Sequence, residues 1–126
     1  MPPVTALHRH FRAGLDRRDP VTGLNDHPEV LAFHRLVFTT PGLAGRLIQY
    51  TQDDEEALAA ALGGDITARL QAAQVLAVQR VLARATWHKL VAGQTADAVY
   101  PEAVADADRA FALLATGTRD ATGPGS

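Results

Sequence analysis

One stretch constrains this chain more than any other. Residues 65–92, DITARLQAAQVLAVQRVLARATWHKLVA, predict a single long helix with no proline inside it. Asp65 can cap its start by accepting hydrogen bonds from the free backbone N–H groups of the first turn. Lys89 and Gly93 suit its other end, where a cation and a left-handed residue are both favoured. We therefore expect the other helices to be arranged around this one.

Two apolar rows run along this helix on different sides. The first row contains Ile66, Leu70, Ala73, Ala77 and Val81. The second row contains Val75, Val78, Leu82 and Ala85. Only the line of Arg69, Arg80, Arg84 and His88 has the polarity of a solvated edge. A helix that is apolar on two sides needs two partners, so we expect its own bundle on one side and keep a second subunit as the candidate for the other.

Composition limits the classes of protein to which the chain can belong. Its 126 residues suffice for one domain that buries roughly two-thirds of its unfolded surface, and it contains no cysteine for disulfides or thiolate chemistry. The net charge of -2 gives no general attraction to nucleic acid or anionic lipid. No signal peptide or membrane-spanning run is recognisable. We expect a cytoplasmic protein that does not contact a membrane.

Four further helices are expected, over residues 5–18, 26–38, 40–62 and 95–115. Asp26 is the predicted N-cap of the second, with Pro28 in the first turn and Glu29 completing a capping box. This short helix is so apolar that we expect it at the centre of the core. Thr40 is the predicted N-cap of the third helix, with Pro41 at its first position.

The last helical region has two expected irregularities. Thr95 caps its start, and Pro101 is expected to break or restart the helix. Residues 1–116 then form the domain, while the glycine-, threonine- and proline-rich end, 117–126, is expected to be a disordered tail. No internal repeat and no strand pattern is visible, so the predicted fold class is all-α, a bundle of about five helices.

An acidic run, residues 53–56, interrupts the third helix. Successive helical residues are about 100° apart, so four of them cannot share one solvated face, and Asp54 falls on the apolar row. The favoured interpretation is a carboxylate that is partly exposed or paired with Arg80 or Arg84. The alternative is a polar group that lines a ligand cavity.

The chain carries little that indicates catalysis. None of the five histidines is spaced i, i+4 on a helix, so no metal site is expected. There is no serine before Ser126, no phosphate-binding glycine loop and no carboxylate pair whose members can be named. We expect no cofactor and no enzyme; an acid–base pair of His34 with Asp54 is the weakest alternative.

Several aromatic and polar residues share the apolar sides of different helices. Phe11, Phe33, Phe38, Tyr50 and Trp87 are the aromatic members. His34, Tyr50, Asp54 and Gln74 are the candidate inward polar groups. Such a set is typical both of a filled core and of an apolar ligand cavity between helices, and the sequence does not choose between them. For His34 alone, a satisfied core position is favoured over contact with a ligand.

Three segments carry a resemblance to a known family. They are DHPEVLAFHRLVFTTPGLAGRL (26–47), AVQRVLARATW (77–87) and DAVYPEAVADADRAFALL (97–114). Their sequence and order resemble the C-terminal regulatory half of tetracycline-repressor (TetR) family transcription factors of the actinobacterial type, over residues 4–115. The resemblance implies an all-helical ligand-binding and dimerisation domain, in which the last two long helices pair with those of a second copy. No segment matches the N-terminal helix-turn-helix unit of that family, so DNA binding is expected only through a domain lacking here.

These expectations define two candidate surfaces. The ligand cavity is assigned to Phe11, Phe33, His34, Val37, Leu47, Tyr50 and Val78. The homodimer interface, or the packing immediately behind it, is assigned to Trp87, Leu90, Val99, Ala103, Ala107, Ala110, Phe111 and Leu114. The expected effector is a small apolar or amphipathic molecule. The alternative is a helical homodimeric interaction module with a filled core and no ligand.

Overall fold

The computed structural model describes residues 3–122, without the side chains of residues 38, 43–51 and 117–122. The described residues form five α-helices and one short 3-10 helix and contain no strand, which confirms the predicted all-α class. The helices are α1 (Pro3–Asp16), η1 (Pro20–Thr22), α2 (Pro28–Thr39), α3 (Pro41–Ala61), α4 (Ile66–Val91) and α5 (Ala96–Thr122).

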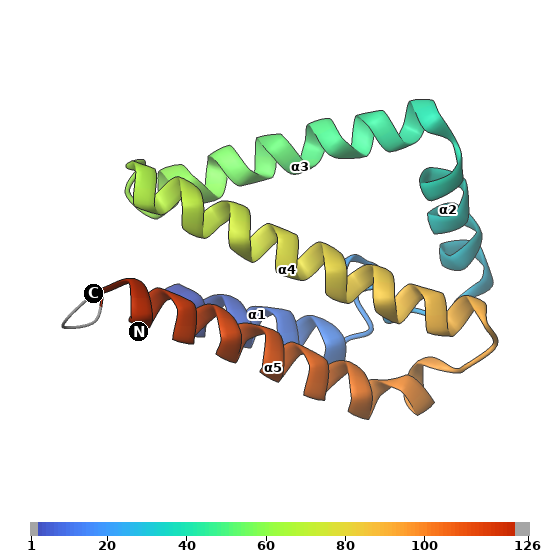
Figure 1. The fold of residues 1–126 in the computed structure, drawn as a ribbon. Helices are drawn as coiled ribbons and strands as arrows, with labels where there is room; N and C mark the ends of the chain where they lie inside the picture. Colours follow the sequence, from blue (N-terminus) through green and yellow to red (C-terminus); the bar gives the residue numbers. More distant parts are fainter. Residues whose placement is uncertain (1–2, 123–126) are drawn as a thin grey trace.

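The long helix α4 lies in the middle of the fold (Figure 1). It packs against α3 on one side and against α5 on the other, while α1 lies along α5. The short helix α2 crosses the far end, where α3 has diverged from α4, and connects α3 to the rest of the chain. The fold is therefore an α1–α4–α5 layer from which the α2–α3 arm extends.

The core of the described residues lies between α1, α4 and α5. Its buried members are Phe11, Leu15, Leu24, Leu90, Ala96, Val99, Ala103, Ala107 and Phe111. The row of small residues on α5 lets neighbouring helices approach closely, and Phe11 and Phe111 fill the space with ring centroids 6.1 Å apart. Most of this core thus comes from helices at the two ends of the sequence.

The connection between α1 and α2 is pressed onto α4. Gly23 has a φ of 81°, and a Cβ built on it would lie 2.1 Å from the carbonyl oxygen of Ala83. Glycine is required here for both reasons, since a side chain would need a disfavoured backbone conformation and would collide with α4. The chain also turns at Arg18, whose φ is 57° and whose N–H donates to Leu15 O.

The helix ends were predicted well where a cap or glycine marks them. Asp65 accepts from Ala68 N and begins α4, as expected. Thr40 is the N-cap residue of α3, as expected, but its side chain makes no capping hydrogen bond. The N-cap of α2 was predicted wrongly. The cap is His27, whose Nδ1 accepts from Glu29 N, because the Asp26 carboxylate is engaged with α5 instead.

The predicted central position of α2 is wrong. Phe33 is 62% exposed and Leu36 is 54% exposed, so this apolar helix is a strap across the surface of the described structure. Periodicity shows that a side chain is apolar but does not show which element covers it. Here α2 has only a limited contact with α4.

The predicted break at Pro101 is also wrong. The helix α5 runs from Ala96 to Thr122 with Pro101 inside it, near the start, where loss of one backbone N–H affects only one hydrogen bond. It also continues beyond residue 116, into the predicted tail. Residues 123–126 of that tail lie outside the described part of the chain.

Candidate functional site

The helix α2 is flanked by two hollows, and we take this region as the candidate binding site. The first hollow, of about 400 Å³, lies between α2 and η1. It is lined by Pro20, Val21, Glu29, Val30, Phe33 and His34. The rings of Phe33 and His34 lie 6.1 Å apart at an angle of 51°, so this hollow has an aromatic wall.

The second hollow, of about 500 Å³, is a groove between another side of α2 and the end of α4. It is lined by Pro28, Leu31, Ala32, Arg35, Leu36 and Thr39 of α2, and by Leu90 and Val91 of α4. Successive lining residues of α2 are alternately three positions and one position apart, so they form one continuous face over three turns. Arg35 is the only ionisable residue among these lining groups.

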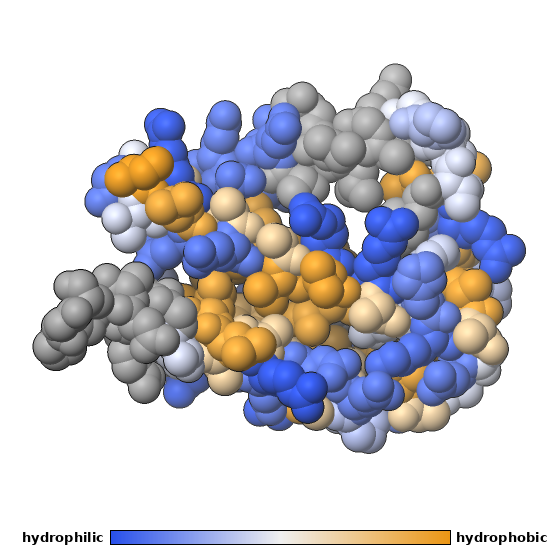
Figure 2. Space-filling view, viewed as in Figure 1, coloured by the Kyte–Doolittle hydropathy of each residue, from blue (hydrophilic) through white to orange (hydrophobic). Residues whose placement is uncertain are grey.

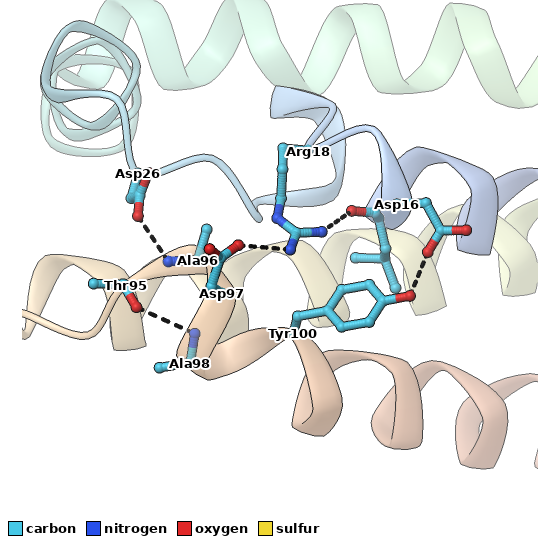
Figure 3. Close-up of polar contacts among 9 residues, drawn as sticks. Asp16, Arg18, Asp26, Thr95, Ala96, Asp97, Ala98 and Tyr100 are labelled. Atoms are coloured by element: carbon cyan, nitrogen blue, oxygen red, sulfur yellow. Dashed lines mark hydrogen bonds and ion pairs between the residues drawn. The ribbon is translucent and has the colours of Figure 1, made fainter.

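A polar junction fixes the N-terminal end of α2 to the start of α5 (Figure 3). Asp26 Oδ2 accepts from the backbone N–H of Ala96 at 2.8 Å, and Asn25 Nδ2 donates to Arg18 O at 2.9 Å. Thr95 Oγ1 accepts from Ala98 N at 3.1 Å and caps α5, as its sequence position predicts. The carboxylate that was assigned to α2 therefore stabilises the first turn of α5.

Arg18 connects the end of α1 to the same turn of α5. Its guanidinium donates to Leu15 O and to Asp97 Oδ1, each at 2.8 Å, and lies 4.6 Å from the centre of the Tyr100 ring. The Tyr100 hydroxyl donates to Asp16 Oδ1. That hydrogen bond, followed by burial, raises the pKa of Tyr100, because an ionised phenolate would face a carboxylate. These contacts hold the end of α1 and the residues before α2 against the first turn of α5.

His34 differs from the other histidines in its surroundings. It is half-buried beside Phe33, and burial lowers its pKa from the ordinary value because the charged imidazolium is less well solvated there. His34 therefore contributes a polar ring to the wall of the first hollow.

The predicted ligand residues do not all meet at one place. Phe33 and His34 share the first hollow, and Val37 is half-buried on α2. Phe11 belongs to the core between α1 and α5, and Val78 packs against that core. Leu47 and Tyr50 lie outside the described side chains. Asp54 and Gln74 are exposed, which agrees with an exposed carboxylate at Asp54.

The residues assigned to a dimer interface lie mostly in the core of the chain itself. Trp87, Leu90, Val99, Ala103, Ala107 and Phe111 are each less than about a tenth exposed, while Ala110 and Leu114 are half-buried. Six of the eight thus already have partners within one chain. They belong to the packing behind any interface and not to its contact face.

A different side of α4 is open. Ile66 is 69% exposed, Leu70 is 56% exposed and Val81 is 63% exposed, and all three belong to the first apolar row. Ala68, Ala72 and Val75 are buried about half a turn away. Figure 2 shows apolar residues along the middle of one face of the molecule, bordered by hydrophilic ones. We call the row of Ile66, Leu70, Ala73, Ala77 and Val81 the α4 stripe.

Neither the second hollow nor the hydrogen bond between Asp26 and Ala96 was predicted from the sequence. The spacing of Leu31, Ala32, Arg35 and Leu36 was available as a signal for one shared face of α2. The contact of Asp26 with Ala96 has no local signal, because it joins positions 70 residues apart.

His8 is another residue whose role depends on tertiary structure. Its Nε2 lies 2.7 Å from Asp108 Oδ1, and its ring stacks on Phe111 with centroids 4.9 Å apart. It thereby joins α1 to α5. Among the residues that the structure describes, no group of three or more histidine, aspartate or glutamate side chains is placed to hold a metal ion.

Comparisons of the chain with protein-family models, curated proteins and solved structures find no match. No helix within residues 3–122 contains a run that is long and apolar enough to cross a membrane.

Proposed function

We propose that the chain is a dimerising, ligand-sensing helical domain like the regulatory half of a TetR-family regulator. In this proposal, two copies associate through the α4 stripe, and a small apolar or amphipathic molecule binds beside α2. A ligand that prefers one position of α2 and α3 would bias the dimer by its difference in affinity for the two arrangements. DNA binding would belong to a separate N-terminal domain.

The main support is the α4 stripe, since the chain leaves Ile66, Leu70 and Val81 of this row more than half exposed. Burial of this apolar surface against a second copy would be favourable.

Support for a ligand comes from the position of α2. Apolar residues on two sides of this helix face hollows of about 400 and 500 Å³, within the range of typical small-molecule sites. The N-terminal end of α2 is held by the hydrogen bond between Asp26 and the start of α5. Phe33 and Leu36, farther along α2, are more than half exposed. A ligand that covered these side chains would gain free energy from the burial of apolar surface.

The α4 stripe by itself also supports a second candidate, a homodimeric interaction module that binds no small molecule. Both candidates need the stripe, and only the sensor needs the hollows beside α2. Retained or added ligand therefore distinguishes the two, whereas the oligomeric state tests what they share.

Sedimentation velocity of the chain and two variants tests the shared claim. Leu70→Glu places a charge in the centre of the α4 stripe and should convert a dimer to a folded monomer. Ala6→Glu introduces the same charge at an exposed position of α1 and should leave the dimer intact. A wild-type monomer, or a Leu70→Glu dimer as tight as the wild type, would refute the proposed interface.

A further inference from the structure

We infer that the groove between α2 and the end of α4 binds an amphipathic anion, with an apolar chain along α2 and its carboxylate at Arg35. This inference rests on the proposed ligand-sensing function and names the class of ligand. It concerns the second hollow, which is not lined by any of the sequence-assigned ligand residues whose side chains the structure describes.

The walls of the groove determine the apolar part of this ligand. Leu31, Ala32 and Leu36 line it from α2, and Leu90 and Val91 line it from α4. The lining residues of α2 extend from Pro28 to Thr39, which corresponds to about 16 Å of helix. An elongated chain fits such a groove better than a compact ring system does, because it covers the whole apolar face.

The charge of the groove determines the polar part. Arg35 is exposed, and the structure gives it no carboxylate partner among the side chains that it describes. None of the described residues that line the groove is acidic, and Glu29 of α2 lines the other hollow. The Thr39 hydroxyl already donates to Arg35 O at 2.7 Å, so the guanidinium is the principal free donor.

Arginine suits a carboxylate because two of its N–H groups can donate to the two carboxylate oxygens in parallel. Its aliphatic stem can also lie along an apolar chain while the guanidinium remains in water. Since Arg35 is at the solvent-exposed rim, we expect the charge to contribute modestly to affinity, by about fivefold. The apolar walls would supply most of the affinity.

Isothermal titration of the full chain with dodecanoate and with dodecanol tests the inference, at concentrations below those at which dodecanoate forms micelles or dodecanol separates from solution. The two probes share the chain and differ in the charge. Dodecanoate should bind wild type about fivefold more tightly than dodecanol does. Arg35→Gln should abolish this preference, Arg35→Lys should retain part of it, and Arg9→Gln, which removes an exposed arginine of α1, should leave it unchanged.

A filled-groove variant locates the site. Ala32 is an exposed lining residue, and Ala32→Phe should reduce the binding of both probes at least tenfold while the chain stays folded. Equal binding of the two probes to wild type, or a preference that survives in Arg35→Gln, would refute the anion assignment. It would leave the sensor proposal intact if Ala32→Phe still reduced binding.

Binding that Ala32→Phe does not reduce would refute the groove as the site while it supported a sensor with another cavity. No binding of either probe to a wild-type dimer would refute the inference and favour the ligand-free interaction module. The failure of the inference and the failure of the proposed function therefore give different results.

Discussion

The carboxylate of Asp26 accepts a hydrogen bond from the backbone N–H of Ala96 at 2.8 Å, although 70 residues separate the two. The contact satisfies a free N–H at the start of α5 and holds the base of α2 against the same turn. A residue that precedes one helix thus caps another, and the position of the strap α2 depends on the first turn of α5.

Removing this cap should destabilise the whole fold. Asp26→Ala is expected to lower the free energy of unfolding by about 1 kcal/mol, the usual effect of losing a capping side chain. Asp26→Asn retains an oxygen acceptor of the same length and should cost less than half as much. Urea unfolding followed by circular dichroism measures both. Equal losses would mean that the charge at the helix start matters and the hydrogen bond does not.

Gly23 and Gly64 have similar φ angles, 81° and 75°, but different surroundings. Gly23→Ala should lower the free energy of unfolding by more than about 2 kcal/mol, because the new Cβ would strain the backbone and collide with Ala83 O. Gly64→Ala, with nothing within 4 Å of its Cβ position, should cost only about 1 kcal/mol, from backbone conformation alone. Chemical unfolding of the two variants gives the difference. Equal costs would show that η1 does not press on α4.

Ala107 is completely buried in the chain's own core, so a charge there does not report on a dimer interface. Ala107→Glu should destabilise each subunit by at least about 3 kcal/mol, through an unpaired buried carboxylate. Ala105→Glu, at an exposed position two residues earlier, should change stability by less than about 0.5 kcal/mol. Thermal unfolding and soluble yield provide the comparison. A soluble Ala107→Glu monomer with normal stability would contradict the described packing of α5.

The lowered pKa of His34 predicts a loss of stability in acid. Its neutral form is favoured by the folded state, so this contribution is present above the unfolded pKa of about 6.5 and is lost as the pH falls through the lower folded pKa. Wild type should therefore lose more stability than His34→Leu between about pH 8 and pH 5. Parallel urea titrations at the two pH values measure this, and identical losses would contradict the assigned burial of His34.

His34→Leu itself should be neutral or stabilising where the core is filled and should alter ligand uptake where a cavity is present.

The sequence predicted the features that local chemistry determines. Asp65 and Thr95 were correct as caps, and Gly93, with a φ of 111°, follows the end of α4 as expected. The two apolar sides of α4 were visible from periodicity, and the structure covers one and leaves Ile66, Leu70 and Val81 exposed.

The errors arose where tertiary contacts override a local pattern. Asp26 has the spacing of an N-cap of α2, but its carboxylate is used by α5, and His27 takes its place. Phe33 and Leu36 made α2 resemble a core helix, yet hydropathy does not reveal that few elements lie next to it. Six of the residues assigned to the interface, or to the packing immediately behind it, are buried within the chain, and their place relative to a second copy stays a prediction.

The central claim is that two copies associate through the α4 stripe and hold a small molecule beside α2. Native mass spectrometry of the purified wild-type chain tests both parts in one measurement, because it reports stoichiometry and retained ligand together. We expect a dimer that carries a discrete additional mass or takes up an added amphiphile. A clean monomer that binds neither a second copy nor a ligand would contradict it.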